Sequence, residues 1–153
     1  MSTIGVISDT HGLLRPEALH TLKGSDIIIH AGDIGTIQVI DELSSIAPVY
    51  AVRGNVDTGS CFSKFPAIEY VKYADVNLYV LHNIDDLDLD PPSADIAVVI
   101  YGHSHQPLME KRHDVLYFNP GSAGPKRFKL PVAVGRLKIG SSGIEGEIIS
   151  LPG

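Results

Sequence analysis

Short apolar runs alternate with segments of helical spacing over the first third of the chain. Three runs have the length and apolar character of buried strands and span residues 3–8, 26–30 and 49–52. Between them, the spacing of apolar residues predicts one helix over residues 15–23 and another from Ile37 to Ile46. Pro16 suits the first turn of the first helix, and Pro48 ends the second. This β-α-β-α-β order predicts a parallel sheet with helices packed against it.

The second half of the chain changes to strand patterns. Six further runs predict strands, over residues 67–73, 76–81, 96–101, 115–119, 132–139 and 144–150. Ala74-Asp75 and residues 140–143 are turn signals between neighbouring runs, so antiparallel hairpins are expected there. Residues 84–93 are acidic and contain two prolines, which predicts a loop or a short helical turn. Together these elements predict an α/β fold with two packed sheets.

The composition suits one domain, residues 1–153, with its own core. The chain has 153 residues, 44% of them hydrophobic, and no segment resembles a linker. Its 12 Lys and Arg against 18 Asp and Glu give a formal charge of −6, so a phosphorylated substrate needs a metal ion or a local basic patch. The lone Cys61 excludes an internal disulfide, and no membrane span or secretion signal is recognised. A cytoplasmic location without membrane contact is expected.

Polar fragments follow several of the predicted strands. They are Asp9-Thr10-His11, Gly32-Asp33, Gly54-Asn55 and Gly102-His103-Ser104-His105. Ligands of parallel sheets collect beyond the carboxyl ends of the strands, so these fragments are expected to share one site. Carboxylate, amide and imidazole groups are ligands for divalent cations. The sequence therefore predicts a metal site and metal-assisted hydrolysis.

The first two fragments each allow a second interpretation. Asp9 and His11 are two residues apart, so an extended backbone would direct both side chains to one side of the strand end. A polar turn between strand and helix is the alternative. Asp33 follows a very apolar strand and either bridges two cations or caps the helix that follows.

The remaining candidate ligands are one amide and three imidazoles. Asn55 offers a carbonyl oxygen to a cation, or serves only as a turn residue. His103 and His105 at the same strand end could each bind a metal, or could be two exposed histidines that stand together by chance. His82 closes another strand and is a further candidate. His30, within a strand, is expected to be a structural histidine. Surface positions are expected for His20 and His113.

The four fragments together resemble the calcineurin-like metallophosphoesterase superfamily. Gly54-Asn55-Val56-Asp57 and Asn119-Pro120-Gly121-Ser122 resemble its small bacterial and archaeal phosphodiesterase branch. The resemblance implies a two-sheet β-sandwich flanked by helices (αββα) with two divalent cations at one edge. It also implies two ligand sets sharing Asp33: Asp9, His11, Asp33 and His105 for one cation, and Asp33, Asn55, His82 and His103 for the other. Manganese is expected first, with nickel, iron or zinc as alternatives.

Two positions depart from the superfamily pattern. Many members carry a histidine after the motif asparagine, where it protonates the leaving group, and this chain has Val56. Asp57, metal-bound water or solvent must then serve, which favours substrates with good leaving groups. The second departure is His82-Asn83 in place of His-Gly, where Asn83 is expected to tolerate a positive φ.

The predicted function is a metal-dependent phosphodiesterase that acts on a small phosphoester. A hydroxide bridging the two cations would attack phosphorus, and Asn55 would contact both metal and substrate phosphate. The alternatives are a non-catalytic protein-binding scaffold of the same fold, a phosphomonoesterase or a nuclease. A homo-oligomer stays open, and substrate choice is assigned to residues 58–64 and 84–93.

Overall fold

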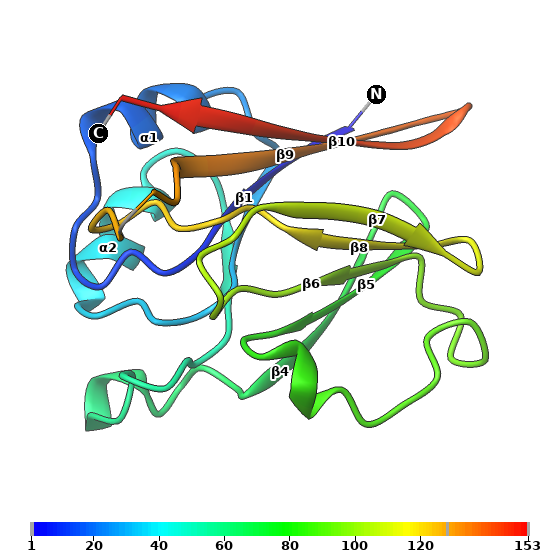
Figure 1. Cartoon of the computed structure of the whole chain (residues 1–153), viewed down its shortest axis with the longest axis horizontal. Coiled ribbons are helices and arrows are strands. Elements are labelled where there is room, and N and C mark those ends of the chain that lie inside the picture. Colours follow the sequence, from blue (N-terminus) through cyan, green and yellow to red (C-terminus); the bar gives the residue numbers. More distant parts are fainter. Residues whose placement is uncertain (1, 128, 153) are drawn as a thin grey trace.

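Two five-stranded sheets pack face to face in the computed structural model, which describes residues 2–127 and 129–152 (Figure 1). The first sheet has the order β10-β9-β1-β2-β3, with β10 Gly143–Leu151, β9 Val132–Gly140, β1 Ser2–Ile7, β2 Ile27–His30 and β3 Val49–Ala51. The second has the order β4-β5-β6-β8-β7, with β4 Ile68–Tyr73, β5 Val76–Leu81, β6 Val98–Ile100, β8 Val115–Asn119 and β7 Leu108–Arg112. The expected two-sheet sandwich is confirmed.

The β-α-β-α-β prediction for the first third is also confirmed. β1 pairs with β2 and β2 with β3 in parallel, while β9 joins the other side of β1 in antiparallel pairing. Helix α1 (Pro16–Leu22) and helix α2 (Ile37–Ser44) pack on the outer face of this sheet through one apolar cluster. α2 ends earlier than predicted, and Ile46 packs against the same cluster from the turn that follows.

The core lies between the sheets and draws on both halves of the chain. Its fully buried members include Ile4, Ile29, Val98, Phe118 and Leu137. A second apolar cluster lies under the helices, and a third is formed by side chains on the outer face of the second sheet. That outer face is covered by the segment containing the 3-10 turn η2 (Ile84–Asp86), through side chains such as Leu87 and Leu89. The expected loop or short helical turn over residues 84–93 is therefore confirmed.

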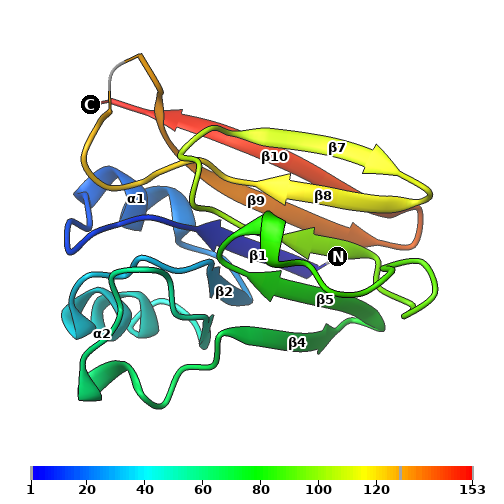
Figure 2. The ribbon, with the colours of Figure 1, turned by 60° about the horizontal axis from the view of Figure 1, so that its bottom comes forward.

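Hairpins form where the turn signals predicted them, and one further hairpin was not predicted. Ala74 and Asp75 connect β4 to β5 with positive φ at both residues, and β9 continues antiparallel into β10. Strand β7 was missed because every residue in it is exposed, so it has no apolar alternation. It pairs antiparallel with β8 across a turn at His113-Asp114, and Figure 2 shows this hairpin beside that of β9 and β10.

Among the helices within the described residues, none is long and apolar enough to cross a membrane. The short 3-10 turn η1 (Ser60–Phe62) lies in the connection from β3 to β4 and carries the exposed Cys61.

Candidate metal centre

The carboxyl ends of strands from both sheets meet at one end of the sandwich, where three of the predicted fragments join His82. Asp9 follows β1, Asp33 follows β2, His82 follows β5 and His105 follows β6. Two overlapping groups have ligand atoms within 4.8 Å of one another: Asp9, His11 and His105, and Asp9, Asp33 and His82. The fragments that lie far apart in the sequence therefore form one cluster.

Asp9 has one oxygen held in place and one without a partner. Its Oδ2 accepts hydrogen bonds from Ser8 Oγ at 2.8 Å and from the His103 N–H at 3.1 Å. Its Oδ1 is buried, has no hydrogen bond, and lies 3.4 Å from His105 Nε2. A buried carboxylate oxygen without a partner is costly, and a bound cation would remove that cost.

Asp33 is arranged in the same way. Its Oδ1 accepts the Val56 N–H at 3.1 Å, while Oδ2 lies 3.2 Å from His82 Nε2 and 3.6 Å from His11 Nε2. Burial acts to raise the pKa of Asp33, but His82, the Val56 N–H and His11 outweigh it and hold that pKa well below its ordinary value. The carboxylate is thus ionised and directed toward the imidazoles.

His82 presents a defined ring nitrogen to the cluster. Its Nδ1 lies 2.8 Å from Ala31 O, and because a carbonyl oxygen only accepts, Nδ1 carries the hydrogen. Nε2 then faces Asp9 and Asp33, the orientation that metal-binding histidines take from such a partner. Burial acts to lower the pKa of His82, but Asp33, Ala31 O and Asp9 together raise it above its ordinary value. The same negative surroundings would hold a cation.

The remaining candidate ligands differ in how closely they join the cluster. His11 Nε2 and His105 Nδ1 are buried without hydrogen bonds, and the two rings lie 5.4 Å apart. The exposed His103 has its ring 5.2 Å from that of His82. Asn55 is exposed next to Val56, and no contact recorded among the described residues links its side chain to the others.

The backbone at the cluster is left-handed, where an extended backbone was expected. The φ angles are +56° at Asp9, +47° at His11, +56° at Asp33, +73° at His103 and +63° at His105. Asp9 and His11 therefore share a side of the sheet because the chain turns between them, and the extended interpretation was wrong. None of these residues is glycine, but Asp and His are among the residue types that take positive φ most often, which is a weak signal at any single position.

Two glycines allow the strands to approach at this edge. A Cβ on Gly102 would lie 2.6 Å from Asp9 Oδ2 and would overlap Ser8 Oγ. A Cβ on Gly54 would overlap the Asp33 backbone nitrogen and Oδ1. The glycines preceding Asn55 and His103 are thus required by close packing against the two carboxylates.

Asp57 and Asn83 hold loops in place. Asp57 is buried, and its two oxygens accept the N–H groups of Ile34, Gly35 and Gly54 at 2.9–3.0 Å. Asn83 has a φ of −115° and accepts the Asp85 N–H with its side chain, so the turn after His82 does not use the positive φ that was expected.

Several supporting residues were missed by sequence reasoning. Ser8 fixes Asp9, as described above. Asn119 donates to Gly102 O and Ser104 Oγ, and Ser122 donates to Asp9 O, so the Asn119-Pro120-Gly121-Ser122 fragment braces the loops that carry the histidines. The sequence had singled out this fragment by its resemblance to the phosphodiesterase branch, but the fragment carries no information about its hydrogen-bond partners.

The non-ligand histidines lie as expected. His30 is fully buried: it accepts the Gly32 N–H at Nδ1 and contacts Thr10 Oγ1 through Nε2, and burial lowers its pKa to about 4. His20 and His113 are exposed.

The donor set suits divalent cations. The four unpartnered buried atoms of the cluster are Asp9 Oδ1, His11 Nε2, His82 Nε2 and His105 Nδ1. Carboxylate oxygen and imidazole nitrogen are ligands for zinc, manganese, iron or nickel, and no thiolate narrows the choice among the described residues.

Comparisons with known proteins agree with this geometry. Residues 2–142 match the model of the calcineurin-like phosphoesterase superfamily domain. A probable metallophosphoesterase of Methanothermobacter thermautotrophicus is 33% identical over 157 residues, covering 95% of this chain and 91% of its own. The solved structure of an archaeal phosphodiesterase has a TM-score of 0.80 at 26% identity over 96% of this chain and 99% of its own. Vps29 from Chaetomium thermophilum has a TM-score of 0.76 at 17% identity over 99% and 98%, which shows a shared fold alone.

Proposed function

Since the chain belongs to the calcineurin-like phosphoesterase superfamily, we propose that it is a metal-dependent phosphodiesterase with a binuclear centre at this edge of the sandwich. The observation that carries the proposal is that Asp9 Oδ1, buried without a hydrogen bond, lies 3.9 Å from each of two equally unpartnered nitrogens, His11 Nε2 and His82 Nε2. Relatives named as phosphodiesterases support the reaction class, including one from Escherichia coli at 27% identity.

The proposed ligands divide between two cations that share Asp33. One cation would be held by Asp9, His11, Asp33 and His105, and the other by Asp33, Asn55, His82 and His103. The tight contacts among Asp9, His11 and His105 support the first set. The ring contact of His82 with His103 supports the second, and Asn55 would turn its exposed side chain toward the cation and the substrate phosphate.

When bound, the two cations would acidify a water molecule for attack on phosphorus and neutralise the charge that develops on the phosphoryl oxygens. The residues of the chain set the geometry for this step. Ser8 and the His103 N–H fix one oxygen of Asp9, so the other keeps its direction. Ala31 O fixes the tautomer of His82, and the Val56 N–H holds Asp33.

The leaving group receives little help from the chain. Val56, which is 49% exposed, occupies the position after Asn55 and has no proton to donate. Asp57 was predicted as a proton donor, but both of its oxygens already accept backbone N–H groups. We therefore assign Asp57 a positioning role and the protonation step to solvent. Substrates with acidic leaving groups, such as aryl esters, should react fastest.

The test uses protein stripped with a chelator and assayed on bis(p-nitrophenyl) phosphate. Activity should return on addition of Mn²⁺. Asp33→Asn should lower kcat at least about 100-fold, because one ligand charge and its share of transition-state stabilisation are lost. Asp41→Asn, an exposed position on α2, is the matched control and should keep full activity. Full turnover in Asp33→Asn would contradict the binuclear proposal.

The competing functions are separated by two simple measurements. A non-catalytic scaffold is kept as an alternative because Vps29 shares the fold, and a protein that bound no divalent ion even at excess would favour it. Comparison of rates on p-nitrophenyl phosphate and its diester separates a monoesterase from a diesterase. The core shared by both sheets supports the further proposal that the chain forms one domain.

A further inference from the structure

A loop rich in basic residues starts and ends at the candidate metal centre. Ser122 and Val132 pair across its base, and the Ala133 N–H donates to Ser122 O at 2.9 Å. We call its described residues, 123–127 and 129–131, the basic loop. Lys126, Arg127 and Lys129 are all exposed in it.

The base of this loop is bonded to the strand end that carries Asp9. Ser122 Oγ donates to Asp9 O at 3.1 Å, and the Ala123 N–H donates to Ser8 O at 3.0 Å. Arg15 donates from its guanidinium to Gly124 O at 3.1 Å, which ties the loop to the start of α1. The basic residues thus follow, within a few positions, a backbone that touches a proposed metal ligand.

The charge of the basic loop is opposite to that of the chain as a whole. The formal net charge is −6, yet residues 115–144 contain no Asp or Glu. Among the described residues, no carboxylate pairs with Arg127 or Lys129. A solvated surface would explain scattered lysines, but this cluster lies, in an acidic protein, on a loop whose base is bonded to the candidate metal centre.

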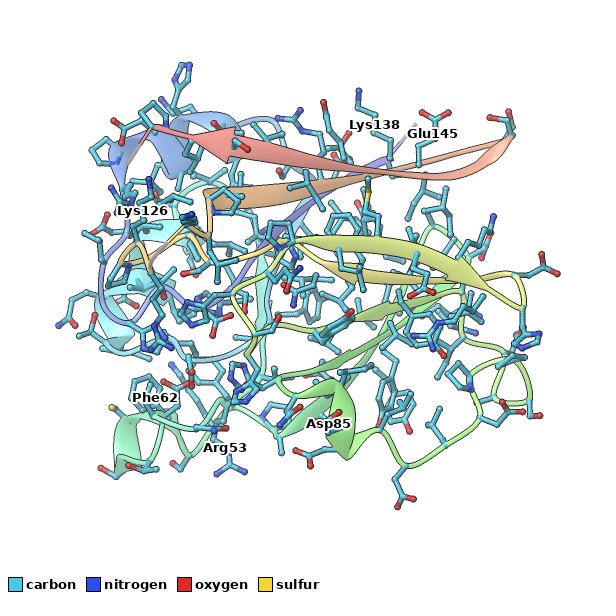
Figure 3. The ribbon with its side chains drawn as sticks, viewed as in Figure 1. Arg53, Phe62, Asp85, Lys126, Lys138 and Glu145 are labelled. Atoms are coloured by element: carbon cyan, nitrogen blue, oxygen red, sulfur yellow. The ribbon has the colours of Figure 1, made fainter. Side chains whose placement is uncertain are left out.

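The segment that follows His82 is acidic. Asp85, Asp86, Asp88 and Asp90 follow the ligand candidate His82 within eight residues. Figure 3 shows Lys126 and Asp85 well separated, with Lys126 toward the upper left and Asp85 toward the bottom. A negatively charged group beyond the reacting phosphate is therefore attracted to the basic loop and repelled from this acidic segment.

We propose that the basic loop binds a second anionic group of the substrate, so that the preferred substrates are phosphodiesters carrying a further phosphate. This rests on the proposed phosphodiesterase function and adds the substrate class to it. Arg127 and Lys129 contact the second phosphate, with Lys126 adding to the local positive charge. Because these side chains are exposed, the preference weakens as salt screens the charges.

The test compares two chromogenic diesters that differ in one phosphate. Thymidine 5′-(p-nitrophenyl phosphate) and its 3′-phosphorylated form share the leaving group and the reacting diester. With Mn²⁺ at low salt, the wild-type kcat/KM should be about tenfold higher for the 3′-phosphorylated form, the size expected from two or three exposed ion pairs. In the triple variant K126Q/R127Q/K129Q the ratio should fall to about one, while the rate on the simpler diester changes little.

A matched control removes three positive charges elsewhere. K72Q/K111Q/K138Q alters exposed lysines on β4, β7 and β9, and Figure 3 shows Lys138 far along its hairpin from Lys126. This control should keep the tenfold ratio. A wild-type ratio near one, or an equal fall in both triple variants, would overturn the inference while leaving the phosphodiesterase function intact.

Failure of the phosphodiesterase function would show as no turnover of either diester. Calorimetric titration of thymidine 3′,5′-bisphosphate into Mn²⁺-loaded protein then decides the inference. Binding about tenfold weaker in K126Q/R127Q/K129Q than in the control variant would support the basic loop, and equal binding would refute it.

Discussion

Ser8→Ala should weaken metal binding without touching a proposed ligand. Ser8 is fully buried and donates to Asp9 Oδ2 at 2.8 Å, so the variant leaves that oxygen with the His103 N–H as its remaining donor. A hydrogen bond to a charged group contributes about 1.5–3 kcal/mol. At about 1.4 kcal/mol per factor of ten, Mn²⁺ affinity should fall about 10–100-fold.

The affinity is measured by titrating Mn²⁺ into metal-free protein and following free Mn²⁺ by electron paramagnetic resonance. Ser150→Ala, an exposed position on β10, serves as the matched control and should bind as wild type does. Urea unfolding of the metal-free proteins checks that the fold is kept. If Ser8→Ala bound Mn²⁺ within twofold of wild type, the orientation of Asp9 by Ser8 would not matter and the reasoning would be refuted.

Asp57→Asn should lower the free energy of unfolding by about 1–3 kcal/mol in urea, because an amide nitrogen cannot accept one of the N–H groups that Asp57 now binds. If Asp57→Asn kept the stability of the wild type while its rates fell more steeply as the pKa of the leaving group rose, Asp57 would be the proton donor instead. His30 predicts a pH dependence for the metal-free protein, because burial lowers its pKa from 6.5 to about 4. The unfolded chain binds this proton first, so stability is complete above pH 6.5 and falls by up to about 3 kcal/mol toward pH 4. In His30→Gln the free energy of unfolding should lose this dependence on pH. If urea unfolding at several pH values gave the same dependence as in the wild type, the role of His30 would be contradicted.

Most of the fold could be predicted because buried strands carry a strong signal. The apolar runs that became β1, β2 and β3 end within one or two residues of their predicted limits, since polar residues follow each run directly. β7 gave no such signal, because an edge strand with both faces exposed needs no apolar residues. The segment over residues 84–93, which covers the outer face of the second sheet, was predicted only as a loop or short helical turn, because its apolar side chains have no regular spacing.

The candidate site could be located from the sequence but not built from it. Polar fragments at strand ends indicated Asp9, Asp33 and the histidines, because parallel strands deliver their carboxyl ends to one edge. The free oxygen of Asp9, the tautomer of His82 and the bracing by Asn119 depend on partners far along the chain. Hydrogen bonds between distant residues leave no local pattern, so only the structure supplies them.

The left-handed backbone at five of the proposed ligands affects which substitutions the sequence can accept in evolution. A side chain at positive φ costs about 1 kcal/mol relative to glycine, so Asp9, His11, Asp33, His103 and His105 together place a conformational load on the native state. Glycine at any of them would relieve strain while deleting a ligand. In the proposed centre, metal binding by these side chains would offset that cost. In a protein of this fold that no longer needed the metal, one substitution to glycine could remove a ligand and stabilise the fold. Such a protein would keep the two-sheet sandwich without the metal centre.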